Sequence, residues 1–324
     1  MLHFDESYFQ EEEKEGFVVS SMMKRAWAAQ LELLEEIKRI CKLLEISYFA
    51  DWGTMLGAVR HQGFIPWDDD LDIGMLRKDY MIFVEKAPKL LEHWYELKSV
   101  NYDPTHDIVK ARLINGRHMN FERSFLEKFH NCPYVVGIDI FPVDNLPVDK
   151  NKEDELIKSL KFLLKVEASI PEEPPYGEEI IDLMKDMEKT FGVQVNYGNR
   201  LRHEVKKMFD SLSAYYVDER TPEVTCMLAQ AAGRQEYRCD RNWYDNFLEM
   251  EFENTSIPVP VGYDGILKLD YGEDYMVPKN LGASHEYPFY KEQIVGLKEM
   301  MEQEFHTKLT EEQMEMLIQA KVFG

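Results

Sequence analysis

Apolar residues recur at helical spacing between residues 18 and 45, with charged residues between them. The positions are Met22, Met23, Ala26, Trp27, Leu31, Leu34, Ile37, Ile40 and Leu44. A stripe with this period lies on one face of an α-helix, where it is buried against a neighbouring element. The pattern predicts one amphipathic helix that packs against the core of the protein.

Short apolar and β-branched runs predict the strands of a sheet. The predicted strands are residues 46–50, 71–75, 106–114 and 134–141, the last of which ends at Pro142. In the strand at 71–75, apolar and acidic residues alternate, as they do in a strand with one buried face. The first strand runs into the turn AspTrpGlyThr, and a helix is expected over 54–59. We therefore expect an α/β (α+β) fold with a mixed sheet flanked by helices.

The pattern changes after about residue 150. Helical stretches rich in Lys, Glu and Leu are predicted at 151–167, 179–190 and 199–215, with a proline-rich acidic connector between the first two. The last part is mixed, with a strand-like segment at 252–260, a turn around 268–275 and a closing amphipathic helix from about 288 to 304. The expected domains are an N-terminal helical segment (1–45), a catalytic core (46–150), a helical insertion or lobe (151–245) and a C-terminal segment that returns to the core (246–324).

Composition narrows the possible functions. The 324 residues are 44% apolar and carry a formal charge of -22, so long-range repulsion makes nucleic acid a poor partner. The four cysteines are scattered, which predicts reduced thiols rather than a zinc site or disulfides. No apolar run approaches the roughly 18 residues of a membrane span, and the acidic N-terminus does not resemble a signal peptide. We expect a cytoplasmic protein that is either free or peripheral at the inner membrane face.

An acidic run supplies the candidate chemistry. Asp68, Asp70 and Asp72 occupy alternate positions, and residues two apart on a strand point the same way, so Asp70 and Asp72 can grip one divalent ion. Asp68, on the preceding turn, is expected to stay outside direct coordination. Asp139 lies in the middle of an apolar strand, where burying an unpaired carboxylate is costly and a metal would compensate. Phosphoryl transfer uses such carboxylate-bound metal.

Three alternatives stand beside this interpretation. A run of acids can be a solvated loop. The spacing from Asp68 to Asp72 also imitates the start of a calcium-binding EF-hand, but Ile73 and Asp79 occupy the positions that such a loop gives to Gly and Glu. Asp139 can instead be a structural acid paired with Lys110 or Arg112.

Three blocks of sequence resemble the LicD family of phosphotransferases, whose eukaryotic relatives are fukutin and fukutin-related protein. The first block is GTMLGAVRHQGFIPWDDDLDIGM, from Gly53. The second is GIDIFPVDNLP at 137–147, and the third is FEN..IPVP..YDGILKLDYGEDYMVP at 252–278. The resemblance covers roughly residues 46–280. It implies a nucleotidyltransferase-like core, in which a Gly-Ser or Gly-Thr turn precedes the metal-binding strand.

The resemblance also implies roles for residues. Gly53 and Thr54 become the phosphate turn, and Gly53 is expected to allow close backbone approach and a positive φ. Asp70 and Asp72 become the metal pair, and Asp139 becomes either a third metal ligand or the base that takes the acceptor proton. Asp144 is an alternative third acid, placed in the loop beyond Pro142.

Further substrate-binding candidates surround this turn. They are Gly57, Arg60, Trp67, Asp68 and Lys110. Arg60 and Lys110 would present charge to a diphosphate, although each could equally form a surface ion pair. Trp67 would stack on a base or cover a trimethylammonium group, or would simply pack the turn.

The resemblance implies a complete reaction. The donor would be CDP-choline or another CDP-alcohol, bound with Mg²⁺ or Mn²⁺, and the acceptor would be a hydroxyl of a cell-surface glycan, a lipid-linked glycan or a teichoic acid precursor. The product would be a phosphocholine-modified polysaccharide and CMP. Two alternatives remain open, which are transfer of glycerol phosphate, ribitol phosphate or a nucleotidyl group on the same scaffold, and a catalytically silent binding protein.

Overall fold

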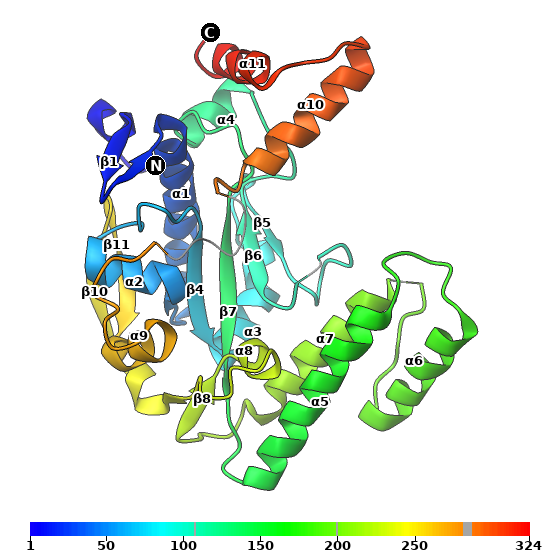
Figure 1. Cartoon of the computed structure of the whole chain (residues 1–324). Helices are drawn as coiled ribbons and strands as arrows, with labels where there is room; N and C mark the ends of the chain where they lie inside the picture. Colours follow the sequence, from blue (N-terminus) through cyan, green and yellow to red (C-terminus); the bar gives the residue numbers. More distant parts are fainter. Residues whose placement is uncertain (107, 199, 281–286) are drawn as a thin grey trace.

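The computed structural model describes residues 1–106, 108–198, 200–280 and 287–324. A mixed sheet lies at its centre (Figure 1). Its strands are β3 (Phe49–Ala50), β4 (Leu71–Leu76), β5 (Glu96–Lys98), β6 (Ala111–Ile114), β7 (Gly137–Asn145), β8 (Glu223–Thr225) and β9 (Cys239–Asp240). The main order is β3-β4-β7-β6-β5, and β8 pairs with both β7 and β9. The predicted mixed sheet is confirmed.

The register of the central strands places charged residues side by side. β4 and β7 run parallel, with Asp72 opposite Asp139. On its other side β7 is antiparallel to β6, where Arg112 is opposite Asp139. Because directly opposite residues share one face of a sheet, the acids of two sequence blocks and a cation of a third segment meet at one place.

The long N-terminal helix is confirmed as α1 (Ser21–Leu44). Ser20 caps it by accepting a hydrogen bond from the Met23 amide, and Glu45 ends it in the left-handed conformation. Its apolar residues belong to the same buried cluster as those of β3, β4 and β7. The helix is therefore part of the sheet's core. The four cysteines are buried and free, as expected.

Shorter helices and turns connect the strands. They are α2 (Trp52–His61), α3 (Arg77–Lys86), α4 (Arg123–Lys128), and the 3-10 turns η1 (Glu6–Phe9), η2 (Ala87–Lys89), η3 (Ala214–Tyr216) and η4 (Arg241–Tyr244). The predicted strand at 106–114 is observed only as β6, and its residue 107 lies outside the described residues.

The prediction that the strand of the second block ends at Pro142 is wrong. β7 continues to Asn145, and Asp144 is therefore a strand residue and not a loop residue. β6 pairs with β7 only as far as Ile140, so one side of β7 has no ladder at Pro142. A proline is tolerated in a strand where no ladder hydrogen bond is needed from its nitrogen.

The three predicted middle helices are confirmed, although residue 199 lies outside the described residues. They are α5 (Lys150–Ser169), α6 (Glu178–Phe191) and α7 (Leu201–Ser213), followed by α8 (Met227–Ala231). Their apolar residues form a separate cluster, which Val109 and Leu146 of the central part also join. Figure 1 shows α5, α6 and α7 grouped beside the lower end of β7. A distinct helical lobe fits this arrangement.

The C-terminal part contains two strands and three helices in the described residues. Its elements are β10 (Phe247–Phe252), β11 (Thr255–Pro260), α9 (Tyr263–Tyr271), α10 (Lys291–Phe305) and α11 (Glu311–Phe323). Residues of β10, β11 and α9 join the main cluster. The expectation of a closing helix at 288–304 is wrong in one respect, because α11 follows α10 and packs on Leu126 of α4.

The N-terminal residues form a hairpin that the sequence did not suggest. β1 (Glu12–Lys14) pairs with β2 (Phe17–Val19), and the turn between them places Glu15 and Gly16 at positive φ. Two successive residues at positive φ are typical of tight hairpin turns. In the described part of the chain, no helix is long and apolar enough to cross a membrane.

Candidate active site

The start of α2 is held in place by the acidic strand beside it. Asp51 caps the helix by accepting a hydrogen bond from the Trp52 amide at 3.0 Å, and its own amide donates to the Asp72 carbonyl. Thr54 Oγ1 accepts a hydrogen bond from the Asp72 amide at 2.8 Å. The Thr54 hydroxyl therefore fixes β4, while the amides of Gly53 and Thr54 belong to the first helical turn, which lacks intrahelical acceptors.

Gly53 is needed for a reason other than the expected one. Among the described residues, Trp52 has a positive φ of 43°, whereas Gly53 is not one of the positive-φ glycines. A Cβ on Gly53 would lie 2.5 Å from Oδ2 of Asp68. The absence of a side chain at residue 53 therefore lets the acidic run approach the helix start. The expectation of a positive φ at Gly53 is wrong, and the expected close approach of phosphate to Gly53 stays a prediction.

The acidic run is crowded with carboxylates. One oxygen from each of Asp68, Asp69 and Asp70 lies within 4.8 Å of the other two. Burial, followed by the neighbouring Asp70 carboxylate, raises the pKa of Asp68 well above its usual range. Burial, followed by the carboxylates of Asp70 and Asp139, does the same to the pKa of Asp72. Asp72 Oδ1 is buried without a hydrogen-bond partner in the described structure.

These properties fit a cation site. A buried oxygen without a donor and several crowded carboxylates are unfavourable unless a proton or a cation compensates them. Hard divalent cations bind carboxylate oxygens of this kind. The residues that could hold one are Asp68, Asp69, Asp70 and Asp72.

Asp139 has protein partners of its own. Its Oδ2 lies 2.5 Å from Lys110 Nζ, and its Oδ1 lies 2.8 Å from Arg112 Nε. Lys110 also lies over the Phe141 ring at 4.4 Å. These ion pairs are those of the structural alternative, yet the register keeps Asp139 beside Asp72. The role of Asp139 as metal ligand or base stays a prediction.

The predicted site residues surround a cavity of about 490 Å³ beside the start of α2, here called the α2 cavity. The predicted residues that line it are Gly53, Arg60, Trp67, Asp68, Asp70, Asp72 and Lys110. Thr54, Gly57 and Asp139 do not line it. A Cβ on Gly57 would collide with the Gly63 carbonyl, so this glycine serves the packing of the helix against the following loop.

The C-terminal block closes the α2 cavity. Arg60 donates from Nη1 to the Tyr275 carbonyl at 2.7 Å, which ties α2 to the segment after α9. Tyr271, Asp274 and Lys279 of that segment line the cavity. The sequence predicts no roles for the residues of this C-terminal block, which was identified only by its resemblance to the family. No local pattern relates these residues to Arg60, more than 200 positions earlier. With Arg60 and Lys110, Lys279 brings three cations to the cavity.

Asp144 belongs to a different arrangement. Arg77 Nε lies 2.5 Å from Asp144 Oδ1, and Arg77 Nη1 lies 2.7 Å from Asp210 Oδ1 of α7. The three side chains are buried. Asp144 is thus paired away from the acidic run, and it lines neither the α2 cavity nor its neighbour.

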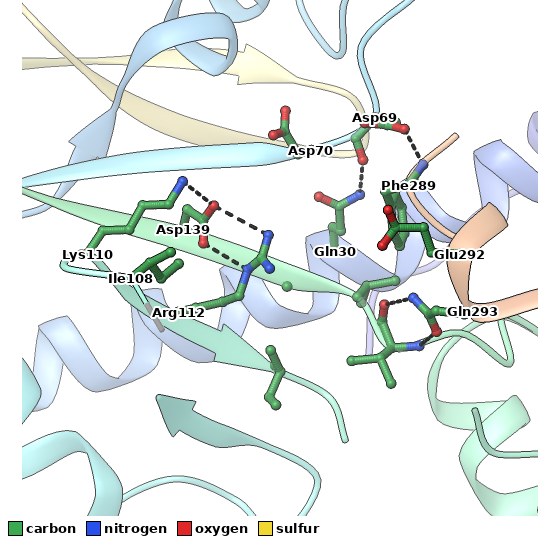
Figure 2. Close-up of a pocket in the computed structure, with 14 residues that line it drawn as sticks. Gln30, Asp69, Asp70, Ile108, Lys110, Arg112, Asp139, Phe289, Glu292 and Gln293 are labelled. Atoms are coloured by element: carbon green, nitrogen blue, oxygen red, sulfur yellow. Dashed lines mark hydrogen bonds and ion pairs between the residues drawn. The ribbon is translucent and has the colours of Figure 1, made fainter. Parts of the chain in front are cut away.

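A second cavity of about 490 Å³ lies next to the first and below the start of α10, and is here called the α10 cavity. Asp70 and Lys110 line both cavities. Figure 2 shows Asp139 and Arg112 on one side of the α10 cavity, with Gln30 and Glu292 on the other. No local feature of the sequence links Gln30 or Glu292 to the site, since each lies on an amphipathic helix.

Comparison with known proteins agrees with this geometry. Residues 45–173 match the family described as LicD/FKTN/FKRP, nucleotidyltransferase domain. Lipopolysaccharide cholinephosphotransferase LicD of Haemophilus influenzae is 26% identical over 252 residues, which are 76% of this chain and 88% of that protein. An uncharacterized protein of Rickettsia typhi is 40% identical over 67 residues, 21% of this chain and 22% of its own. An uncharacterized protein of Rickettsia prowazekii is 37% identical over 84 residues, 26% of this chain and 30% of its own. Over residues 45–173 the chain therefore matches the nucleotidyltransferase domain of the LicD/FKTN/FKRP family.

Proposed function

We propose that this protein transfers phosphocholine, or a similar phospho-alcohol, from a CDP-alcohol to a glycan hydroxyl. The α2 cavity carries the proposal, because one space joins the first turn of α2, the carboxylates of the acidic run and three cations from distant segments. Similarity to the Haemophilus influenzae cholinephosphotransferase supports phosphocholine as the transferred group and lipopolysaccharide as the type of acceptor.

The donor's diphosphate would lie against the first turn of α2. Helix N-termini bind phosphate through free amides and the helix dipole, and Arg60, Lys110 and Lys279 add positive charge around the same space. Trp67 and Tyr271 supply aromatic surface for the cytosine base or the trimethylammonium group. The negative charge of the whole chain does not oppose a donor whose alcohol is cationic.

Asp70 and Asp72 would hold a Mg²⁺ or Mn²⁺ ion, with Asp68 beside them and Asp139 as a possible further ligand. Bound there, the ion would neutralise charge on the diphosphate. The chain's own residues would orient the donor and keep its distal phosphorus near the junction of the two cavities. Asp139 or another carboxylate would accept the hydroxyl proton as the acceptor attacks.

The bonds of the proposed reaction balance. The acceptor oxygen forms a bond to the distal phosphorus of the CDP-alcohol, and the bond from that phosphorus to the bridging oxygen breaks. CMP leaves with the electron pair of the broken bond, and the hydroxyl proton passes to a carboxylate and then to water. The products are a phosphodiester on the acceptor, CMP and a proton.

CMP release tests the proposal directly. The protein and Mg²⁺ are incubated separately with CDP-choline, CDP-glycerol and CDP-ribitol, and CMP and ligand-induced thermal shifts are measured. We expect CDP-choline to give the largest concentration-dependent stabilisation and the fastest CMP release. Asp72→Asn should abolish CMP release while keeping the fold, because it removes charge with little change in volume. Absence of CDP-alcohol binding in the presence of Mg²⁺ would contradict the proposal and favour the alternative of a catalytically silent binding protein.

A further inference from the structure

The α10 cavity has a different composition from the α2 cavity that it adjoins. It is framed by α1, β6, β7 and the segment from Phe289 to Gln293, and it shares Asp70 and Lys110 with the α2 cavity. A group bound in either cavity therefore reaches the same two side chains. Transfer between two substrates requires a shared boundary of this kind, because the reacting atoms must approach to about 3 Å.

The side of this cavity formed by α1 contains an unpaired hydrogen-bond acceptor. Gln30 is 1% exposed, and its Nε2 donates to the Asp69 carbonyl at 2.8 Å. Gln30 Oε1 is buried and has no hydrogen-bond partner in the described structure. In Figure 2 this oxygen points away from Asp69 and toward the space between Asp70 and Asp139. A buried amide oxygen of this kind is satisfied by a ligand's O–H or N–H donor.

On the same side of the cavity as Gln30, the segment from Phe289 to Gln293 is held in position by hydrogen bonds at two points. Asp69 Oδ2 accepts a hydrogen bond from the Phe289 amide at 2.6 Å. Gln293 holds the backbone of Val135 from both sides, accepting from its amide and donating to its carbonyl, each at 2.9 Å. Glu292 lies between these two points and faces the cavity (Figure 2). No ion pair joins Glu292 to another described residue, so its carboxylate is available to accept hydrogen bonds.

The charge of the lining disfavours an anionic occupant. Four carboxylates line the α10 cavity, those of Asp69, Asp70, Asp139 and Glu292, against the two cations Lys110 and Arg112. Both cations are already paired with Asp139. A phosphate or carboxylate placed there would lie beside the Glu292 carboxylate, whereas hydroxyl groups would find several oxygen acceptors.

We infer that the α10 cavity binds the acceptor, and that the acceptor residue it takes is an uncharged, hydroxyl-rich sugar recognised by Gln30 and Glu292. This inference rests on the proposed function for the direction of transfer, but sugar binding itself does not depend on it. The sugar hydroxyl nearest Asp70 would be the one that attacks the donor phosphorus, with the bond changes given above.

Ligand-observed NMR with metal-free protein in EDTA measures sugar binding without catalysis. The probes are methyl β-D-glucoside, methyl β-D-galactoside, methyl N-acetyl-β-D-galactosaminide and methyl β-D-glucuronide. We expect at least one neutral glycoside to bind. The anionic glucuronide should bind at least about 10-fold more weakly, because the carboxylates of the lining repel its negative charge. In a second sample with Mg²⁺ in place of EDTA, CDP-choline should bind in the glycoside's presence without displacing it.

Two variants test the assignment to this cavity. Gln30→Leu should weaken neutral glycoside binding by about 3- to 10-fold, the effect of one lost hydrogen bond. Glu292→Ala should fold normally, because Glu292 is exposed on a helix. It should weaken neutral glycoside binding by a similar factor and reduce the difference in affinity between the neutral glycosides and the glucuronide. Glu299→Ala is the matched control, since it lies on α10 but does not line the cavity. Each variant should leave the Kd for CDP-choline within about two-fold.

Several outcomes would overturn the inference. Unchanged glycoside binding in both Gln30→Leu and Glu292→Ala would place the sugar elsewhere, and so would an equal loss in Glu299→Ala. One-for-one displacement of the glycoside by CDP-choline would show that the two cavities form one donor site. Preference for the glucuronide would contradict the argument from charge. If glycosides bind as expected but no CDP-alcohol does, the proposed function fails and the sugar site stands.

Discussion

Asp139 is open to two explanations, as a catalytic carboxylate or as a structural ion-pair partner. It faces Asp72 across the parallel strands, and it is ion-paired with two cations. A catalytic carboxylate and a structural ion-pair partner differ in what their removal does. The first changes the rate for each folded molecule, and the second changes the fraction of molecules that are folded.

Asp139→Asn is expected to lower the rate of CMP release by about 10²- to 10⁴-fold, the usual contribution of a general base. It should cost less than the roughly 3–5 kcal/mol of a fully buried broken pair, because the Arg112 side chain is 44% exposed and can be hydrated. CMP release and urea unfolding are measured on the same preparation.

Asp144→Asn is the matched control for Asp139→Asn, since both acids are buried and ion-paired on β7. Asp144 lines neither of the two cavities, so its variant should lose stability while activity per folded molecule stays near that of the wild type. If Asp139→Asn behaves in the same way, Asp139 is a structural acid and the three-carboxylate mechanism is wrong.

At the scale of elements, the structure shows which helices and strands can be predicted from their own sequence alone. The helix α1 and the strand β4 were predictable because each carries a complete periodic pattern within its own sequence. The end of β7 was predicted too early, because a proline usually marks the end of a strand. Pro142 is tolerated within β7 because the pairing with β6 ends at Ile140. α11 has buried Met314, Ile318 and Val322 at four-residue spacing, a pattern that was present in the sequence but was not used.

The candidate site was predictable only where its residues are adjacent in sequence. The Gly-Thr turn and the acidic run lie within one motif, so their meeting required no knowledge of the tertiary fold. The meeting of Gln30 and Glu292 at one cavity did require knowledge of the tertiary fold, because these two residues are more than 250 positions apart in the sequence. Polar residues on amphipathic helices are usually solvated, and no local signal separates those that face a cavity.

The stability of the folded protein depends on pH through Asp51, the N-cap residue of α2. Burial, followed by the nearby Asp270 carboxylate, raises the pKa of Asp51 to about 8. An aspartate in the unfolded chain has a pKa of about 3.9. The folded protein therefore binds a proton that the unfolded protein lacks between these values, so this contribution to stability is full below about pH 4 and is lost as the pH rises to 8.

Asp51→Asn should remove this dependence, because asparagine is neutral and caps helices as well as aspartate does. Relative to the wild type, the variant should gain about 1 kcal/mol in unfolding free energy for each pH unit between 5 and 7. Urea unfolding at several pH values checks it. Parallel profiles for the two proteins would mean that Asp51 is ionised in the folded protein throughout this range.

At the scale of the whole molecule, a buried ion-pair triad joins the sheet to the helical lobe. Arg77 begins α3, Asp144 belongs to β7, and Asp210 belongs to α7 of the lobe. Asn101 Nδ2 also donates to Asp210 at 3.1 Å. The lobe has an apolar cluster of its own. The triad adds a buried polar link between α7 and the central strands.

Arg77→Met is expected to destabilise the protein by about 3–5 kcal/mol, because two carboxylates that are almost fully buried lose their cation. Urea unfolding at pH 7 measures the loss. Neutralising the stranded acids as well, in Arg77→Met/Asp144→Asn/Asp210→Asn, should recover part of that stability, since the cost comes from unpaired charge and not from the missing guanidinium itself. Arg123→Met is the control, because Arg123 pairs with Glu127 on an exposed helix face, where an ion pair contributes little. A loss below about 1 kcal/mol in Arg77→Met, or no recovery in the triple variant, would show that the triad does not hold the lobe to the sheet.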